Sequence, residues 1–108
     1  MNSYKTKDDN LQTVVVKMTA KQIINKEYKG KKNFMTPEVL SYGNISNNVA
    51  YEISTGRGFD NEKIYGLSIV KLNDDGSTKR MTDHSGCFSS MYEVDKRVEN
   101  LKDMGILL

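Results

Sequence analysis

The segment KIYGLSIVKL, residues 63–72, constrains the fold more than any other part of this 108-residue chain. Its apolar side chains fall on both faces of an extended strand: Leu67 belongs to one face and Val70 to the other. A strand that is apolar on both faces needs a cover on each of them. The sequence therefore predicts a strand in the interior of a sheet, with other elements packed on its two faces.

Further strands are predicted on both sides of this segment. The alternation of apolar and polar residues in VAYEIST, residues 49–55, is typical of a half-buried strand. The NDDG sequence at 73–76 is a turn signal, and the polar residues 77–82 fit an exposed edge strand. Residues 11–18, LQTVVVKM, are rich in β-branched side chains and predict one more strand. We therefore expect a small, mostly antiparallel sheet of about four strands.

The region between residues 19 and 48 predicts short helices and turns. Thr19 and Gln22 have the spacing of a capping box, so a helix should begin at Ala20. In TPEVL, residues 36–40, a threonine, a proline and a glutamate favour a single helical turn. Residues 41–48, SYGNISNN, have the composition of a turn-rich linker.

The C-terminal segment predicts the longest helix. Ser90 and Glu93 have the spacing of a second capping box, and Gly105 is well placed to end the helix. The apolar residues at helical spacing are Met91, Val94, Val98 and Leu101. The predicted fold is therefore an α+β domain over residues 11–108, preceded by a flexible tail at 1–10. The C-terminal helix should pack on one face of the sheet, and a short N-terminal helix belongs to the same domain.

Composition narrows the function classes. Cys87 is the only cysteine, so no disulfide can form within the chain. No apolar run approaches the roughly 18 residues of a membrane span, and the polar N-terminus lacks the features of a secretory signal. The net charge of +2 is too small to indicate nucleic-acid binding by itself. We expect a cytoplasmic protein that has no membrane partner.

The glycines Gly56 and Gly58 raise the possibility of a phosphate-binding loop. Such a loop precedes a helix, whose N-terminus binds the anion, whereas a strand is predicted to follow here. The glycines therefore indicate a hairpin connection. Arg57, Phe59 and Asp60 form its candidate partner-binding surface. The alternative is that Phe59 tucks into the end of the sheet and Arg57 is simply solvated.

The DHSGC sequence at 83–87 brings together His84 and Cys87. A nucleophilic pair needs the imidazole within hydrogen-bond reach of the thiol, and no second polar cluster supplies an oxyanion hole. A structural zinc site needs four ligands, whereas this loop offers three at most. We expect Cys87 to be a small core residue, and we expect no catalytic residue, metal or cofactor.

A basic segment at residues 26–34 is the alternative binding site. Lysines can neutralise phosphates while aromatic rings stack on bases. The candidate nucleic-acid contacts are Lys26, Tyr28, Lys29, Lys31 and Lys32. The simpler interpretation is a solvated loop after a helix.

Parts of the second half of the chain resemble known domains. Gly86 and Phe88, followed by a capped helix, resemble the strand-to-helix passage of plant ethylene-response-factor and integrase arm-binding domains. Those families read DNA with arginine and tryptophan on the sheet, and this chain has no tryptophan. The element order from residue 20 resembles a double-stranded-RNA-binding domain, whose lysine cluster at the last helix is replaced here by Met91, Tyr92 and Glu93.

The stretch YEISTGRGFDNEKIYGLSIVKL at 51–72, taken with the C-terminal helix, is similar to small uncharacterised proteins of phages and mobile elements in AT-rich bacteria. This resemblance implies no known activity. The expected function is non-catalytic binding of a host protein, with nucleic-acid binding through residues 26–34 as the alternative. A homodimer is a further possibility.

Overall fold

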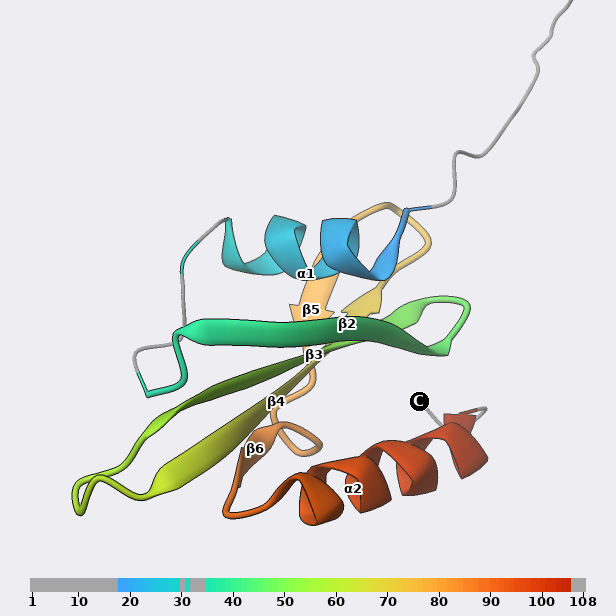
Figure 1. Cartoon of the computed structure of the whole chain (residues 1–108). Helices are drawn as coiled ribbons and strands as arrows, with labels where there is room; N and C mark the ends of the chain where they lie inside the picture. The colour runs from blue at the N-terminus through green and yellow to red at the C-terminus, as the bar shows by residue number, and fades with distance from the viewer. Residues whose placement is uncertain (1–17, 30, 32–34, 106–108) are drawn as a thin grey trace, which may run out of the picture.

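The described part of the chain forms an antiparallel sheet with one helix on each face (Figure 1). The computed structural model describes residues 18–29, 31 and 35–105. The predicted tail at 1–10 and nearly all of the predicted strand at 11–18 lie outside these residues. The described elements are α1 (Ala20–Tyr28), β2 (Glu38–Ser46), β3 (Val49–Arg57), β4 (Lys63–Leu72), β5 (Thr78–Arg80), β6 (Gly86–Phe88) and α2 (Met91–Asp103).

The predicted position of residues 63–72 in the interior of the sheet is confirmed. Four of the five strands follow the order β2-β3-β4-β5, and the fifth strand, β6, also pairs with β4. β5 and β6 therefore share the outer edge of β4: Arg80 pairs with Val70, and Gly86 pairs with Leu67. All of these pairs are antiparallel, so the α+β class predicted from the sequence is correct.

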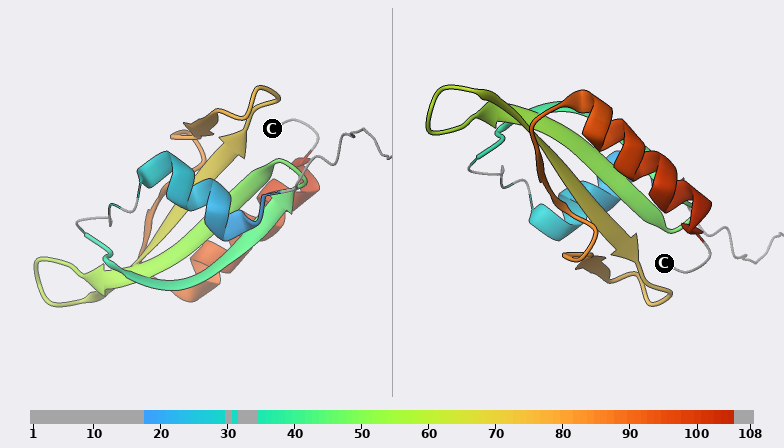
Figure 2. Two further views of the ribbon diagram at one scale, coloured as in Figure 1. Left: turned by 90° about the horizontal axis from the view of Figure 1, so that it is seen from above. Right: turned by 90° about the horizontal axis from the view of Figure 1, so that it is seen from below.

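Both faces of the sheet are covered, as the apolar pattern of β4 predicts (Figure 2). The helix α2 packs on the face that carries Leu67 and Ile69, and α1 packs on the face that carries Val70. Complete burial of one such side chain contributes about 1.5–3 kcal/mol. The α2 cluster contains Ile45, Val49, Ile53, Leu67, Ile69, Val94, Val98 and Leu101, and the α1 cluster contains Ala20, Ile23, Ile24, Ala50 and Val70.

The helices begin where the capping sequences predict. At α1 the Gln22 N–H donates to Thr19 Oγ1 over 3.2 Å, and the Thr19 N–H donates to Gln22 Oε1 over 2.8 Å. At α2 the Glu93 N–H donates to Ser90 Oγ over 3.2 Å. The Glu93 carboxylate accepts hydrogen bonds from the backbone N–H and the hydroxyl of Ser89, at 3.2 and 2.9 Å. Both N-caps satisfy backbone donors that a helix leaves free.

The prediction for residues 36–48 is wrong. Neither a helical turn nor a linker is present, because β2 runs through most of this region and pairs with β3. Gly43 lies directly opposite Tyr51, and a Cβ atom at position 43 would collide with the Tyr51 ring. The ring thus covers the glycine, an arrangement that stabilises a glycine within a strand. Pairing with β3 overrides the local preference for turns.

Candidate functional site

The β3–β4 hairpin extends past both helices and ends in a tight loop (Figures 1 and 2). The two strands pair along their whole length, and Arg57 opposite Lys63 is the last pair before the loop. A hollow of about 170 Å³ lies at this end of the hairpin, lined by Glu38, Thr55, Gly56, Arg57 and Lys63. The predicted hairpin connection is confirmed, and no helix follows the glycines.

The loop is held by its own backbone. The Gly58 N–H donates to the Glu62 carbonyl over 2.8 Å, and the Asn61 N–H donates to the Gly58 carbonyl over 3.0 Å. The Asp60 N–H donates to Glu62 Oε1 over 3.1 Å. Asn61 takes the left-handed conformation with φ 61°, which asparagine tolerates better than most residues. These bonds give the tip a defined shape.

Phe59 lies at this tip and is 99% exposed. The alternative expectation, that its ring tucks into the end of the sheet, is wrong. Arg57 and Asp60 are also exposed, and the Arg57 guanidinium donates to the Asn61 carbonyl over 3.3 Å. The three predicted contact residues therefore lie on one ordered loop and are all exposed, with Phe59 between Arg57 and Asp60 in the sequence.

The described residues of the basic segment at 26–34 differ in their exposure and contacts. Lys26 Nζ donates to the Gly76 carbonyl, which ties α1 to the turn before β5. Tyr28 is half-buried against the α1 core cluster, and its buried hydroxyl has no hydrogen-bond partner in the described part of the chain. Lys29 and Lys31 are exposed, while Lys32 lies outside the described residues. The half-buried Tyr28 ring is therefore poorly placed to stack on a base.

Within the sequence at 83–87, the side chains of His84 and Cys87 do not form an interacting pair. Cys87 is exposed on β6, so the prediction that it is a core residue is wrong. His84 lies in the loop between β5 and β6, where its N–H donates to the Met81 carbonyl over 3.1 Å and its carbonyl accepts from Arg97 over 3.5 Å. Among residues 18–29, 31 and 35–105, no group of three or more His, Cys, Asp or Glu side chains could hold a metal ion.

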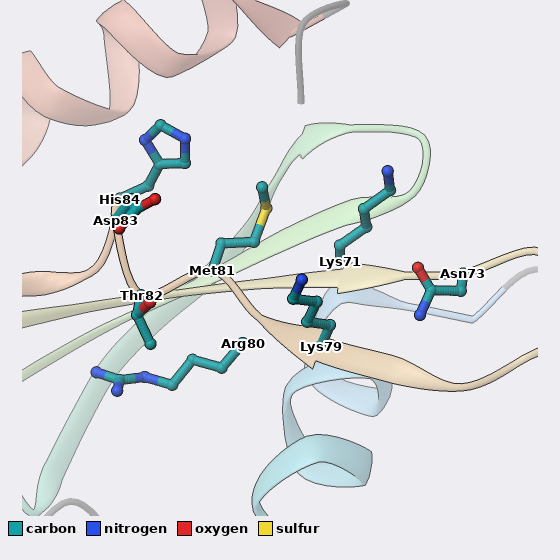
Figure 3. A pocket seen from close by; sticks show the side chains of 8 residues that line it. All are labelled: Lys71, Asn73, Lys79, Arg80, Met81, Thr82, Asp83 and His84. Atoms are coloured by element: carbon teal, nitrogen blue, oxygen red, sulfur yellow. The ribbon is translucent and has the colours of Figure 1, made fainter.

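A second hollow, which sequence reasoning missed, lies beside β5 (Figure 3). It measures about 370 Å³ and most of its lining is polar. The signal that could have revealed it is the hairpin register around the NDDG turn, which places Lys71 opposite Lys79. The lining residues are Lys71, Asn73, Lys79, Arg80, Met81, Thr82, Asp83 and His84.

Hydrogen bonds shift the pKa of two carboxyl groups, and neither group lies at the hairpin tip. The Ser77 hydroxyl and N–H, at 2.6 and 2.9 Å, lower the pKa of Asp75 in the turn before β5. The hydroxyl and N–H of Ser89 lower the pKa of Glu93 at the start of α2. Both shifts are explained by turn and cap formation, because the bonding groups are local.

Comparison of the chain with protein-family models, curated proteins and solved structures found no significant match. No helix in the described part of the chain has both the length and the apolar character needed to cross a membrane. A functional assignment therefore depends on the chemistry of the surfaces described above.

Proposed function

We propose that this chain is a small, non-catalytic binding protein that docks on a host protein through the tip of its β3–β4 hairpin. The observation that carries the proposal is the 99% exposure of Phe59 on a loop fixed by its own hydrogen bonds. Origin from a phage or mobile element and a cytoplasmic setting belong to the same proposal. They rest on the resemblance of residues 51–72 and on the single cysteine.

An ordered loop suits this role because little conformational freedom is lost when it binds. Immobilising a flexible side chain or loop lowers affinity, and a preformed loop avoids much of that cost. A buried aromatic ring is also a common energetic centre of protein interfaces. The complementary partner site is an apolar pocket for Phe59, flanked by an acidic group that faces Arg57 and a basic group that faces Asp60.

The test is affinity capture from a bacterial lysate, with the captured proteins identified by mass spectrometry. The wild-type chain should retain a discrete host protein. Phe59→Ala should weaken its binding by about 30-fold or more, the effect of losing roughly 2 kcal/mol at an interface centre. Arg57→Ala should weaken it to a smaller extent, because rim charges contribute less than a buried anchor.

Tyr92→Ala is the matched control. Tyr92 is a second exposed aromatic residue, 71% exposed on α2, and it lies on a different element from the hairpin tip. If Phe59→Ala and wild type captured the same proteins in equal amount, the proposal would be wrong.

Sedimentation over a range of protein concentrations would show whether the partner is a second copy of this chain, in which case Phe59→Ala should remove the association.

Direct nucleic-acid binding through Lys26, Tyr28, Lys29, Lys31 and Lys32 is less well supported. The hydrogen bond from Lys26 to Gly76 and the half-burial of Tyr28 leave fewer groups available to a nucleic acid. If this alternative were correct, Lys31→Glu would abolish binding to labelled DNA or RNA, and the binding would weaken steeply with salt.

A further inference from the structure

The two faces of β5 have different environments. On the α1 face, Thr78 Oγ1 donates to Glu27 Oε1 over 2.7 Å, which fixes the strand to that helix. On the opposite face, α2 packs mainly against β2, β4 and β6. The α2 side of β5 is consequently left open to solvent, and the hollow of about 370 Å³ lies at this corner (Figure 3).

The strand register explains why this corner is basic. Lys71 follows Ile69 by two residues, so its side chain lies on the α2 face, and its cross-strand partner Lys79 lies on the same face. Arg80 lies opposite Val70 on the other face and reaches the rim of the hollow. Met81 packs against the α2 core cluster and contributes an apolar surface.

Positive charge dominates the lining. It includes the cations Lys71, Lys79 and Arg80, against the single carboxylate of Asp83. Neither Lys79 nor Arg80 has an ion-pair partner within the part of the chain that the structure describes. The Asp75 carboxylate in the preceding turn is already occupied by the hydroxyl and N–H of Ser77.

We propose that this hollow binds a phosphate-bearing ligand. A phosphate group carries several acceptor oxygens, and the donors it prefers are the ammonium and guanidinium groups of lysine and arginine. The volume lies near the lower end of the roughly 300–1,000 Å³ range of ligand pockets, which suits a phosphate with a small organic group. A free phosphate compound and a single-stranded nucleic-acid backbone both present this chemistry.

The direct test is NMR titration of the ¹⁵N-labelled full chain at about 50 mM salt, a condition that favours phosphate contacts. The probes are inorganic phosphate, adenosine monophosphate and a short single-stranded oligonucleotide, titrated separately. Saturable shifts of the Lys71 amide and the amides of residues 79–84 with at least one probe are expected. A free phosphate compound as the ligand predicts shifts with the small probes. A nucleic acid predicts shifts only with the oligonucleotide, lost at higher salt.

A charge-matched pair of variants separates the hollow from net charge. Lys79→Gln with Arg80→Gln removes two positive charges at the site, and Lys21→Gln with Lys96→Gln removes two exposed charges elsewhere. The first pair should weaken binding at least tenfold, and the second should leave it within about twofold, because only the first removes direct donors. Equal weakening by both pairs would overturn the proposal. So would the absence of shifts at residues 79–84 with all three probes in the wild-type chain.

Discussion

Ser54 Oγ donates a hydrogen bond of 2.8 Å to Thr36 Oγ1, and both residues are buried. The bond joins β3 to the segment that leads into β2. Ser54 also pairs with Gly66 across the β3–β4 ladder, so Thr36 lies over the glycine. Ser54 and Thr36 thus form a small polar cluster in place of apolar packing at this end of the sheet. The cluster fits because Gly66 has no side chain.

The Ser54–Thr36 bond can be measured with a double-mutant cycle. Ser54→Ala should lower the free energy of unfolding by about 1–3 kcal/mol, because the buried threonine hydroxyl loses this donor. Thr36→Val should cost a similar amount. In the double variant the two losses should not add, with a coupling free energy of about 0.5 kcal/mol or more. Urea denaturation of the four proteins gives these values, and strictly additive losses would show that the bond contributes nothing.

Gly66→Ala should destabilise the fold by about 1–3 kcal/mol, the usual cost of overpacking. A Cβ atom at this position would lie 2.5 Å from Thr36 Oγ1 and 2.7 Å from Ser54 Oγ, too close for either group to stay in place. Gly86→Ala is the control, since a Cβ atom there would meet only the Phe88 ring at 4.0 Å. Thermal and urea denaturation should place the control within about 0.5 kcal/mol of wild type. Equal effects of the two substitutions would contradict the prediction.

Phe59→Ala should leave the free energy of unfolding within about 0.5 kcal/mol of wild type, because the ring is almost completely exposed and has no packing to lose. Leu67→Ala, in the α2 core cluster, should cost about 2–5 kcal/mol. Urea denaturation of both variants checks this difference. A substantial loss of stability in Phe59→Ala would mean that the ring packs in solution, and reduced capture by that variant would then report misfolding.

Glu93 should make the free energy of unfolding depend on pH in the acid range. Its pKa lies below the ordinary value of 4.5, chiefly because the Ser89 hydroxyl bonds to the carboxylate. Folding therefore favours the ionised form. The contribution of Glu93 to the free energy of unfolding is present above about pH 4.5, and it is lost as the pH falls through the lowered pKa. Urea denaturation between about pH 5 and about pH 3 should show a shallower loss of stability in Glu93→Gln than in wild type.

Glu99→Gln is the control for this measurement. It removes one exposed carboxylate from the same helix, away from the N-cap. The difference between the two variants then reports the contact between Glu93 and Ser89, and the change in net charge cancels. Identical pH profiles for the two variants would contradict the assignment.

The sequence predicts those elements whose signals are local. Thr19 and Ser90 mark both helix starts correctly because an N-cap is satisfied within a few residues. The alternation of β3 and the apolar residues on both faces of β4 are equally direct signals, because apolar side chains mark the faces that a strand buries. The same pattern predicts that both faces of β4 are covered, and the structure shows that α1 and α2 provide the two covers.

The errors arise where distant parts of the chain decide the structure. β2 exists because β3 lies beside it, and its register shifts near Leu40 and Ile45 match a strand that follows a curved neighbour. The short strand β6 depends on pairing with residues 65–67 of β4. The facing lysines of the basic hollow follow from the hairpin register around the NDDG turn. Its openness depends on where α2 stops covering the sheet, which no local pattern of residues encodes. The exposure of Phe59 likewise depends on the loop hydrogen bonds.

The position of β3 has a consequence for local opening. Both of its edges are paired and both of its faces are covered, so the amides of residues 50–53 should exchange with solvent deuterium only when the whole sheet opens. The amides of residues 59–61, at the hairpin tip, lack that protection. Because the ordered tip lies outside this protected interior, its residues can change without disturbing the interior, so recognition and global stability can vary independently through sequence change.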